Sequence, residues 1–431
     1  MTITATTAPF RLVRLAIIIS IVAAAVAAGV EAAGDDEEGQ GEGLVALDAA
    51  GALHFNSSDP LTQAVLVNGL DVLSVLKEQA SEIEANSDLI ASQDARITAL
   101  RQDLCSLHPP HLGRVSGAGF SFHKWAGGVL APNGLIYGVP RTSTSVAILN
   151  PTTNTIDTTT IATIPVGLFK WHSGVLAPNN GVIYCFPAQH ASVLKIDPST
   201  NTVDMSTIVL DAGSRSSSDK FRSGVVANNG LIYAVPYSAS SVLIVDPVAD
   251  TADTTTLRGF GSAANKWWGA VLVPDGRIFG IPRNADAVLI IDPETNALDT
   301  TSISRFASGL EWAGGVLAGN GLIYGMPFDG DAVLIIDPEH MTADITTLAG
   351  PGGAEQWAGG VLAANGKVVG IPYNSDSVLV IDPEANAADT TTLTGAGETI
   401  AKFRGGVLAP NGLIYGFSNH ANHLLVIDLG C

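Results

Sequence analysis

Cysteine, basic residues and charged residues in general are scarce in this sequence of 431 residues. Its 3 Cys are too few for a fold built on disulfides. Lys and Arg number 21 against 41 Asp and Glu, and a net charge of −20 excludes nucleic acid as a partner, because its phosphates would be repelled. Charged residues make up 14% and hydrophobic residues 46%, so a large core can form and wholesale disorder is excluded.

The N-terminal segment predicts export from the cell. Arg11 and Arg14 precede an apolar run over residues 15–30, which is shorter than the roughly 20 residues that a membrane-spanning helix needs. We interpret residues 1–32 as a signal peptide or, alternatively, as an uncleaved signal anchor. The protein would then be secreted or held at the extracellular face of the plasma membrane, and Asn56 would be a glycosylation acceptor.

A stalk is predicted between this segment and the rest of the chain. Residues 33–68 are acidic and irregular, with short β-like pieces at 44–47 and 53–55. From residue 69 an apolar residue recurs every seventh position: Leu76, Ile83, Ile90, Ile97 and Leu104. This heptad predicts a coiled coil over residues 69–108, as a dimer or trimer; the alternative is a single helix that packs on the globular part. Pro109 and Pro110 must end the helix.

Seven copies of one unit follow from residue 111. Each begins with Trp or Phe, and the valine four residues later falls at 129, 175, 225, 271, 316, 361 and 407. Each unit continues with a strand, an Asn-Gly type of turn and a second strand ended by Pro. A third strand and an Asp-Pro turn follow. A Thr-rich fourth strand is expected to start near an aspartate: Asp157, Asp204, Asp253, Asp299, Asp344 or Asp389. The pattern predicts an all-β, seven-bladed β-propeller over residues 111–431.

The seventh unit stops after its third strand, so its fourth strand must come from elsewhere. Residues 113–119 match the missing strand and would close the ring, which leaves no free sheet edge. Cys105 lies just before this segment and Cys431 just after the strand that it would pair with, so a Cys105–Cys431 disulfide is predicted. Cys185 is expected to be a buried, inert thiol.

The repeat resembles the YVTN-type propeller repeat and the wider group of NHL and streptogramin-lyase-like propellers. The likeness rests on Gly-Val-Leu-Ala-Pro-Asn-Gly-Leu-Ile-Tyr-Gly, with Ser-Val-Leu-Ile-Ile-Asp-Pro-Glu-Thr-Asn as the later part, and it covers residues 113–431. It implies the fold and leaves activity open, because these families include lyases, lactonases and binding modules. The histidines do not match a lyase set of catalytic His and Glu.

Binding is expected on the face that carries the loop after each second-strand proline and the recurrent Lys-Trp or Lys-Phe pairs. Aromatic rings beside amides and cations suit glycans or peptides. The tryptophans themselves are interpreted as packing wedges between blades. The predicted ligand-binding residues are those after the proline, which vary most between the units: Arg141, Gln189, His190, Tyr237, Arg283, Asn284, Phe328, Asp329, Tyr373, Asn374, Asn419 and His420.

No metal or cofactor site is predicted. The aspartates before Pro occur once in each unit and cannot converge on one ion, so they are interpreted as turn caps. The favoured function is an extracellular binding or adhesion module that presents propeller heads on an oligomeric stalk, which would add avidity. The alternatives are a secreted enzyme of the lyase or lactonase kind and a structural subunit of an extracellular assembly.

Overall fold

The computed structural model describes residues 45–47, 53–55, 66–67, 70–211, 219–304, 306, 311–350 and 352–430. For residues 45–73, 75, 76, 98 and 101–106 it describes the backbone alone. The predicted signal or anchor (1–32), the glycosylation at Asn56 and the Cys105–Cys431 disulfide lie outside this description. None of the described helices is both long enough and apolar enough to cross a bilayer.

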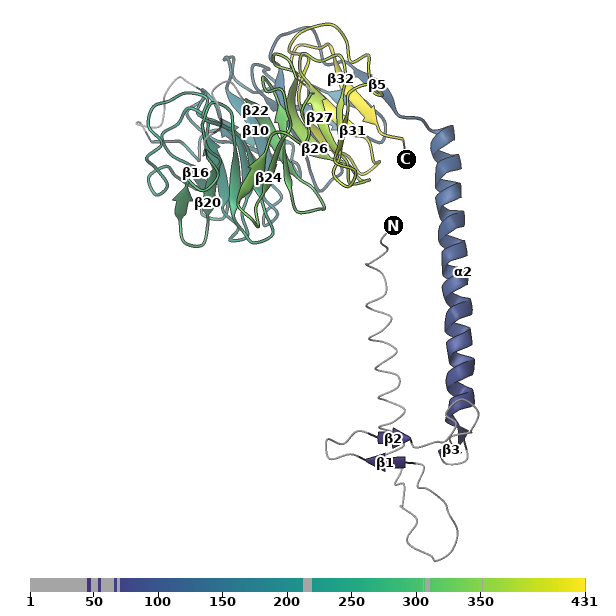
Figure 1. Ribbon diagram of the computed structural model, residues 1–431. Helices are drawn as coiled ribbons and strands as arrows, with labels where there is room; N and C mark the ends of the chain where they lie inside the picture. The colour runs from purple at the N-terminus through teal and green to yellow at the C-terminus, as the bar shows by residue number, and fades with distance from the viewer. Residues whose placement is uncertain are drawn as a thin grey trace, which may run out of the picture. The chain divides into compact units, whose positions relative to one another are not determined.

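The chain divides into two units, Met1–Gln102 and Asp103–Cys431. In the first, β1 (Val45–Leu47) pairs with β2 (Leu53–Phe55), and β3 (Leu66–Val67) pairs with β4 (Leu70–Asp71), both antiparallel. A single helix, α2 (Val72–Leu107), then runs for 36 residues and ends before Pro109 and Pro110. The predicted helix is confirmed, and Figure 1 shows it as one unbroken rod.

Seven four-stranded antiparallel sheets form the propeller seen in Figure 1. The first three blades are β6 (Trp125–Leu130), β7 (Ile136–Pro140), β8 (Ala147–Asn150) and β9 (Thr155–Asp157); β10 (Trp171–Leu176), β11 (Ile183–Pro187), β12 (Leu194–Asp197) and β13 (Thr202–Asp204); and β14 (Phe221–Val226), β15 (Ile232–Pro236), β16 (Leu243–Asp246) and β17 (Thr251–Asp253).

The remaining blades repeat this order of strands. They are β18 (Trp267–Leu272), β19 (Ile278–Pro282), β20 (Leu289–Asp292) and β21 (Ala297–Asp299); β22 (Trp312–Leu317), β23 (Ile323–Pro327), β24 (Leu334–Asp337) and β25 (Thr342–Asp344); β26 (Trp357–Leu362), β27 (Val368–Pro372), β28 (Leu379–Asp382) and β29 (Ala387–Asp389); and β30 (Phe403–Leu408), β31 (Ile414–Ser418), β32 (His423–Asp428) and β5 (His111–Ser116).

The last blade confirms the predicted closure of the ring. Its outer strand β5 pairs with β32 in the register Leu424↔Val115 and Val426↔Gly113. The closing strand therefore covers residues 111–116 rather than 113–119.

The fourth strands differ from the prediction in their position. Each ends at its aspartate instead of starting there, as in β29, which ends at Asp389. The Asp389 carboxylate accepts hydrogen bonds from the backbone N–H groups of Thr391 and Thr392. This Asx turn ends the ladder, so the Thr-rich segment that follows is a turn and not a strand.

The core lies between the blades rather than inside one of them. Trp171, at the start of the second blade, packs with Val129 and Tyr137 of the first blade, and the other anchor aromatics repeat this arrangement. Its indole N–H donates to the backbone carbonyl of Ser192. The interpretation of the tryptophans as wedges is confirmed, and Cys185 is buried and reduced as expected.

The outer turns fasten neighbouring blades together. In the first blade, Asn133 donates from its side-chain amide to the Pro198 carbonyl of the next blade, and the Tyr137 hydroxyl donates to Asn201. The same contact joins the seventh blade to the first through Asn411 and Pro151. The aspartates before Pro cap these turns, as Asp197 does for the N–H of Ser199.

Candidate functional site

A β-bulge at the start of each innermost strand places one side chain in the central channel. The register of β6 against β7 shifts between Trp125 and Gly128, and the other blades show the same shift. A bulge re-aims the side chain that it contains. In six blades the residue that follows the anchor aromatic therefore lines the channel mouth: Ala126, His172, Arg222, Trp268, Ala358 and Arg404.

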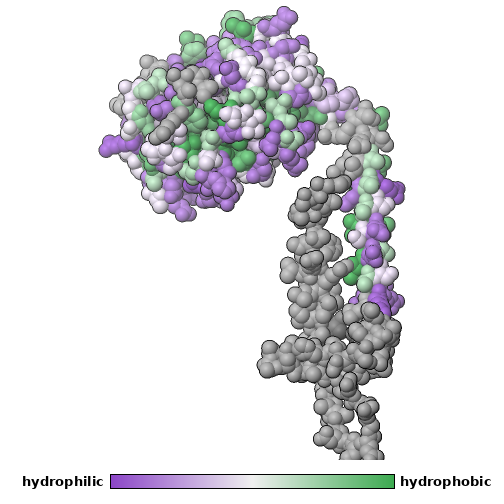
Figure 2. Space-filling model, viewed as in Figure 1, coloured by the Kyte–Doolittle hydropathy of each residue, from purple (hydrophilic) through white to green (hydrophobic). Residues whose placement is uncertain are grey.

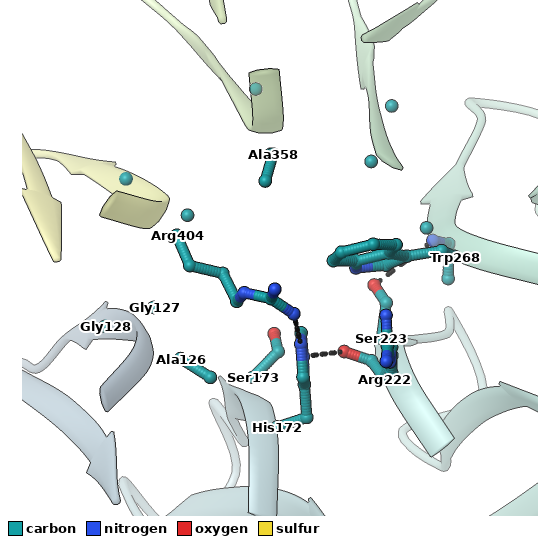
Figure 3. Close-up of a pocket in the computed structure, with 18 residues that line it drawn as sticks. Ala126, Gly127, Gly128, His172, Ser173, Arg222, Ser223, Trp268, Ala358 and Arg404 are labelled. Atoms are coloured by element: carbon teal, nitrogen blue, oxygen red, sulfur yellow. Dashed lines mark hydrogen bonds between the residues drawn. The ribbon is translucent and has the colours of Figure 1, made fainter. Parts of the chain in front are cut away.

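These residues surround a cavity of about 160 Å³ on the channel axis. Figure 3 shows Arg404, His172 and Trp268 directed into it from three separate blades. Glycines form its constriction. A Cβ placed on Gly359 would lie 2.9 Å from the Cα of Gly405.

Hydrogen bonds hold the imidazole of His172 in one tautomer. One imidazole nitrogen, Nδ1, lies 3.0 Å from the backbone carbonyl oxygen of Arg222, which can accept a hydrogen bond but cannot donate one. The other nitrogen, Nε2, lies 3.1 Å from the Arg404 guanidinium, which can only donate. The ring is therefore neutral, with its proton on Nδ1. Burial and the charges of Arg222 and Arg404 agree with this, because they lower the pKa of His172 well below its usual range.

Aromatic rings pack against the guanidinium groups of Arg222 and Arg404. Arg222 lies 3.7 Å from the ring centre of Tyr237 and 4.3 Å from that of Trp268. Arg404 lies 4.9 Å from the centres of Trp268 and Tyr373. These rings are themselves buried, so their faces hold arginine by cation–π contact and offer little area to a ligand.

Positive charge at the mouth is only partly neutralised. Arg222 forms an ion pair of 2.8 Å with Asp219, and Arg141 lies 3.8 Å from the same carboxylate. Arg404 is 5% exposed, and within the described residues no carboxylate lies within 4.0 Å of it. Burial and the charges of Arg404 and Arg222 lower the pKa of Arg141. A guanidinium stays protonated, so this shift reflects the cost of holding unneutralised positive charge together.

Several N–H groups of these arginines make no hydrogen bond in the part of the chain that the structure describes. They include the Nε–H groups of Arg141, Arg222 and Arg404. Buried donors without acceptors are costly in a folded protein, and a functional site is one common reason for them. The arrangement suits an oxyanion, whose lone pairs would accept from several guanidinium groups.

A second group of charges lies near Trp268 and Phe328. Arg283 pairs with Glu311 at 2.6 Å and with Asp329 at 3.3 Å. Burial and the neighbouring Asp329 raise the pKa of Glu311. This part of the mouth is therefore balanced or slightly acidic, in contrast to the side that carries Arg141, Arg222 and Arg404.

The structure brings together five of the predicted ligand-binding residues. All five directly follow the proline of their blade. Four of them contact the channel residues or one another, namely Tyr237, Arg283, Phe328 and Tyr373. Arg141 lies 3.8 Å from Asp219, which is the ion-pair partner of Arg222. Asp329 joins them through Arg283.

The other predicted residues serve the loops or the outer rim. The Gln189 amide reaches Asp219, whereas His190 stacks on Trp171 with ring centres 4.3 Å apart. The backbone N–H of Asn284 bonds to a neighbouring carbonyl, and the side chains of Asn374 and Asn419 bond to the backbone of Ala401. His420 lies 3.2 Å from His123. Burial and the charge of Arg141 lower the pKa of His123 to about 4.

The recurrent lysines do not belong to the binding surface. Lys124 is 2% exposed, and its ammonium donates to the carbonyl oxygens of Ser121 and Ala421. Lys170 likewise donates to Ser143 and Gly167. These lysines tie the loops of adjacent blades together, and their ammonium groups are used by backbone carbonyls rather than offered to a ligand.

Sequence reasoning missed the channel residues themselves. His172, Arg222, Trp268 and Arg404 stand between an invariant aromatic and a small residue, within the most regular part of the repeat. The signal was present, because this position changes from Ala to His, Arg or Trp between units. The bulge that turns it into the channel could not be read from a period-two strand pattern.

Comparisons with known proteins identify the fold. No family model and no curated protein matches the chain. Among solved structures it is similar to streptogramin B lyase, with a TM-score of 0.59, 11% identity, and coverage of 74% of this chain and 97% of that one. A catalytically inactive virginiamycin B lyase from Staphylococcus aureus, with quinupristin, gives a TM-score of 0.60 at 10% identity and coverage of 74% and 100%.

An extracellular domain of a two-component system from B. thetaiotaomicron is also similar. Its TM-score is 0.55 at 11% identity, with coverage of 74% of this chain and 42% of that one. At these identities the likeness defines the architecture. The chain carries a seven-bladed propeller with the same fold as streptogramin B lyase.

Proposed function

We propose that this protein is an extracellular binding module whose channel mouth recognises an anionic group of its ligand. One observation carries the proposal: Arg222 and Arg404, from different blades, line a cavity of about 160 Å³, and the Nε–H of each makes no hydrogen bond among the described residues. The cavity has room for a small oxyanion or for the anionic end of a larger molecule. Acidic glycans and acidic peptides both offer such a group.

The charge distribution supports selectivity for anions. The chain carries −20 overall, so an anion is repelled by most of the protein and attracted mainly where positive charge is gathered. Arg404 is the central residue, since it reaches the cavity and has no carboxylate partner among the described residues. A bound oxyanion would supply the acceptor that its Nε–H lacks.

Binding of the full-length protein to an array tests the proposal. The array carries neutral, uronate-bearing and sulfated glycans together with acidic and neutral peptides. Acidic probes should bind and neutral ones should not. Arg404→Gln should weaken binding roughly tenfold to a hundredfold, as the loss of a charge-assisted hydrogen bond predicts. Arg258→Gln is the matched control, because Arg258 is exposed and lies outside the channel. Equal binding of neutral probes, or an unchanged Arg404→Gln variant, would refute anion recognition.

A secreted enzyme is the second candidate function. The fold likeness to a lyase supports it, as does the pair Glu311 and Asp329, in which Glu311 has a raised pKa and could hold a proton for general acid catalysis. Glu311→Gln would then abolish turnover of an acidic substrate while binding persists. Binding without turnover in the wild-type protein would leave the binding module as the function.

We further propose that α2 associates with copies of itself as a stalk. The large apolar side chains Leu89, Ile90, Ile97 and Leu100 are 47–64% exposed, and Figure 2 shows hydrophobic residues among hydrophilic ones along the helix. A second or third helix would bury this stripe. Sedimentation should give a dimer or trimer that Ile90→Lys converts to a monomer. A monomeric wild-type protein would contradict the stalk, and mass that grows with concentration would favour a structural assembly.

A further inference from the structure

The seventh blade lacks the hairpin turn that the other six contain. In those blades an Asx-Pro turn links the third strand to the fourth, as at Asp337 and Pro338 between β24 and β25. In the seventh blade β32 and β5 come from distant parts of the chain and pair through a ladder, with no turn between them. Three side chains gather where the missing turn would be: His108, His111 and Asp428.

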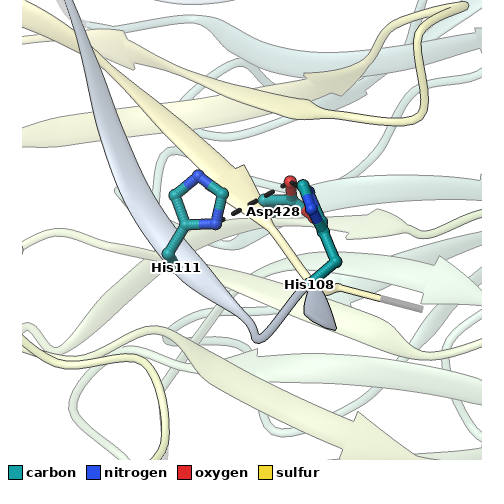
Figure 4. A group of neighbouring side chains, drawn as sticks. All are labelled: His108, His111 and Asp428. Atoms are coloured by element: carbon teal, nitrogen blue, oxygen red, sulfur yellow. Dashed lines mark hydrogen bonds and ion pairs between the residues drawn. The ribbon is translucent and has the colours of Figure 1, made fainter. Parts of the chain in front are cut away.

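We propose that His108, His111 and Asp428 bind a divalent transition-metal ion of the zinc class, which clasps the two strands that close the ring. Figure 4 shows the two imidazoles and the carboxylate turned toward one another. Nε2 of His108 lies 3.1 Å from Oδ2 of Asp428, and Nδ1 of His111 lies 3.8 Å from the same oxygen. The three ligand atoms all lie within 4.8 Å of one another.

These distances are close to those of a tetrahedral site. Ligand atoms bound to zinc at 2.0–2.2 Å lie about 3.3 Å apart, so small side-chain movements complete the geometry. Nδ1 of His111 also lies 3.3 Å from the carbonyl oxygen of Pro109, and the ion would replace that contact. Both histidine side chains are more than half exposed, so water can fill the remaining coordination position.

The backbone around these ligands is unusually constrained. Pro109 and Pro110 separate the two histidines and restrict the conformations of the segment, which lowers the entropy lost when both bind one ion. Gly430 packs against this segment from the other strand: with φ +73°, a Cβ there would lie 2.6 Å from the carbonyl oxygen of His108. The two ends of the propeller are therefore held close together without a covalent turn.

The Asp428 carboxylate is oriented for the ion by the same kind of backbone hydrogen bond that caps the other turns. The Gly430 N–H donates to Oδ1 of Asp428 at 2.8 Å, just as the Glu339 N–H donates to Oδ1 of Asp337 at 2.9 Å. This leaves Oδ2 directed at the imidazoles. A hydrogen bond that fixes a ligating carboxylate is a common outer-shell feature of metal sites. Two nitrogens and one oxygen suit zinc, nickel or copper, whereas calcium and magnesium require oxygen ligands.

Zinc titration of the full-length protein, freed of metal by chelator and dialysis, tests this metal site. One Zn²⁺ should bind per chain and raise the melting temperature, while Ca²⁺ should leave it unchanged. His108→Ala should abolish both effects, and Asp428→Asn should weaken binding at least tenfold. The control is His340→Ala, because His340 pairs with Asp337 at 2.8 Å at the equivalent turn of the fifth blade but has only that one carboxylate.

Two results would overturn the proposal. One is a wild-type protein that takes up no more zinc than His108→Ala. The other is zinc binding that survives His108→Ala but is lost in His123→Ala, because His123 and His420 form a separate imidazole pair at the channel rim. Unchanged circular dichroism of the variants would show that their folds are intact, and His108 itself is exposed.

Discussion

The close approach of glycines in the channel predicts a large cost for a single added methyl group. Gly359 has φ +93°, and a Cβ there would meet Gly405 at 2.9 Å from its Cα and 3.2 Å from its nitrogen. Gly366, in the same blade, has φ +82°, and no described atom comes within 4 Å of its Cβ position. The two positions share the positive φ and differ in the space around them.

Gly359→Ala should therefore carry two penalties and Gly366→Ala only one. A left-handed backbone costs an alanine roughly 1–2 kcal/mol. Overpacking against rigid backbone adds about 1–3 kcal/mol, because Gly405 cannot rotate away as a side chain could. We expect the free energy of unfolding to fall by about 2–5 kcal/mol in Gly359→Ala and by about 1–2 kcal/mol in Gly366→Ala.

Urea unfolding of both variants, followed by tryptophan fluorescence, measures the difference. The slope against urea should not change, so the midpoints report stability directly. Equal losses in the two variants would refute the reasoning, since the contact between Gly359 and Gly405 would then contribute nothing beyond backbone strain.

Three further predictions follow from the packing between blades and from the turns. Trp312→Ala should cost about 3–5 kcal/mol in urea unfolding, because the ring is fully buried, whereas the exposed Phe122→Ala should cost almost nothing. Tyr415→Phe should lower stability by about 1 kcal/mol, since it removes the hydroxyl that donates to Asn154 across the junction of the last and first blades; an unchanged midpoint would contradict this. Hydrogen bonds from Thr392 and Thr391 lower the pKa of Asp389 to about 2, and Asp344 behaves alike. Their contribution to stability is complete above the unfolded pKa of about 4 and is lost as the pH falls toward 2, so Asp389→Asn should flatten the acid limb of a pH–stability curve.

The repeated parts of the fold could be predicted because each blade meets the same physical requirement. Trp125 and its equivalents must pack between two sheets, and each Asn-Gly type of turn must adopt positive φ, so the same residues return every 45 to 50 positions. The Thr-rich segments misled the assignment of the fourth strands. β propensity suggested strands there, but the Asp389 side chain competes for the backbone N–H groups and ends the ladder first.

The candidate site was predicted in part. Arg141, Tyr237 and Tyr373 were found because post-proline residues vary between blades. Arg404 and His172 were missed, because their position looks like an interior strand residue until the bulge turns it into the channel. The histidine and aspartate cluster was missed for another reason: His108 and Asp428 are 320 residues apart, and no spacing rule connects them.

The sequence by itself determined that seven equivalent sheets form and that a strand ahead of the first completes the last one. Those features depend on local patterns, namely alternating apolar residues, turn residues and a near-constant period, and each unit carries them independently. Only the tertiary structure decided which side chains meet. Bending seven sheets into a ring brings His172, Arg222 and Arg404 around one cavity, and its closure brings His108 to Asp428. Such convergence depends on distances across the ring, which no one repeat contains.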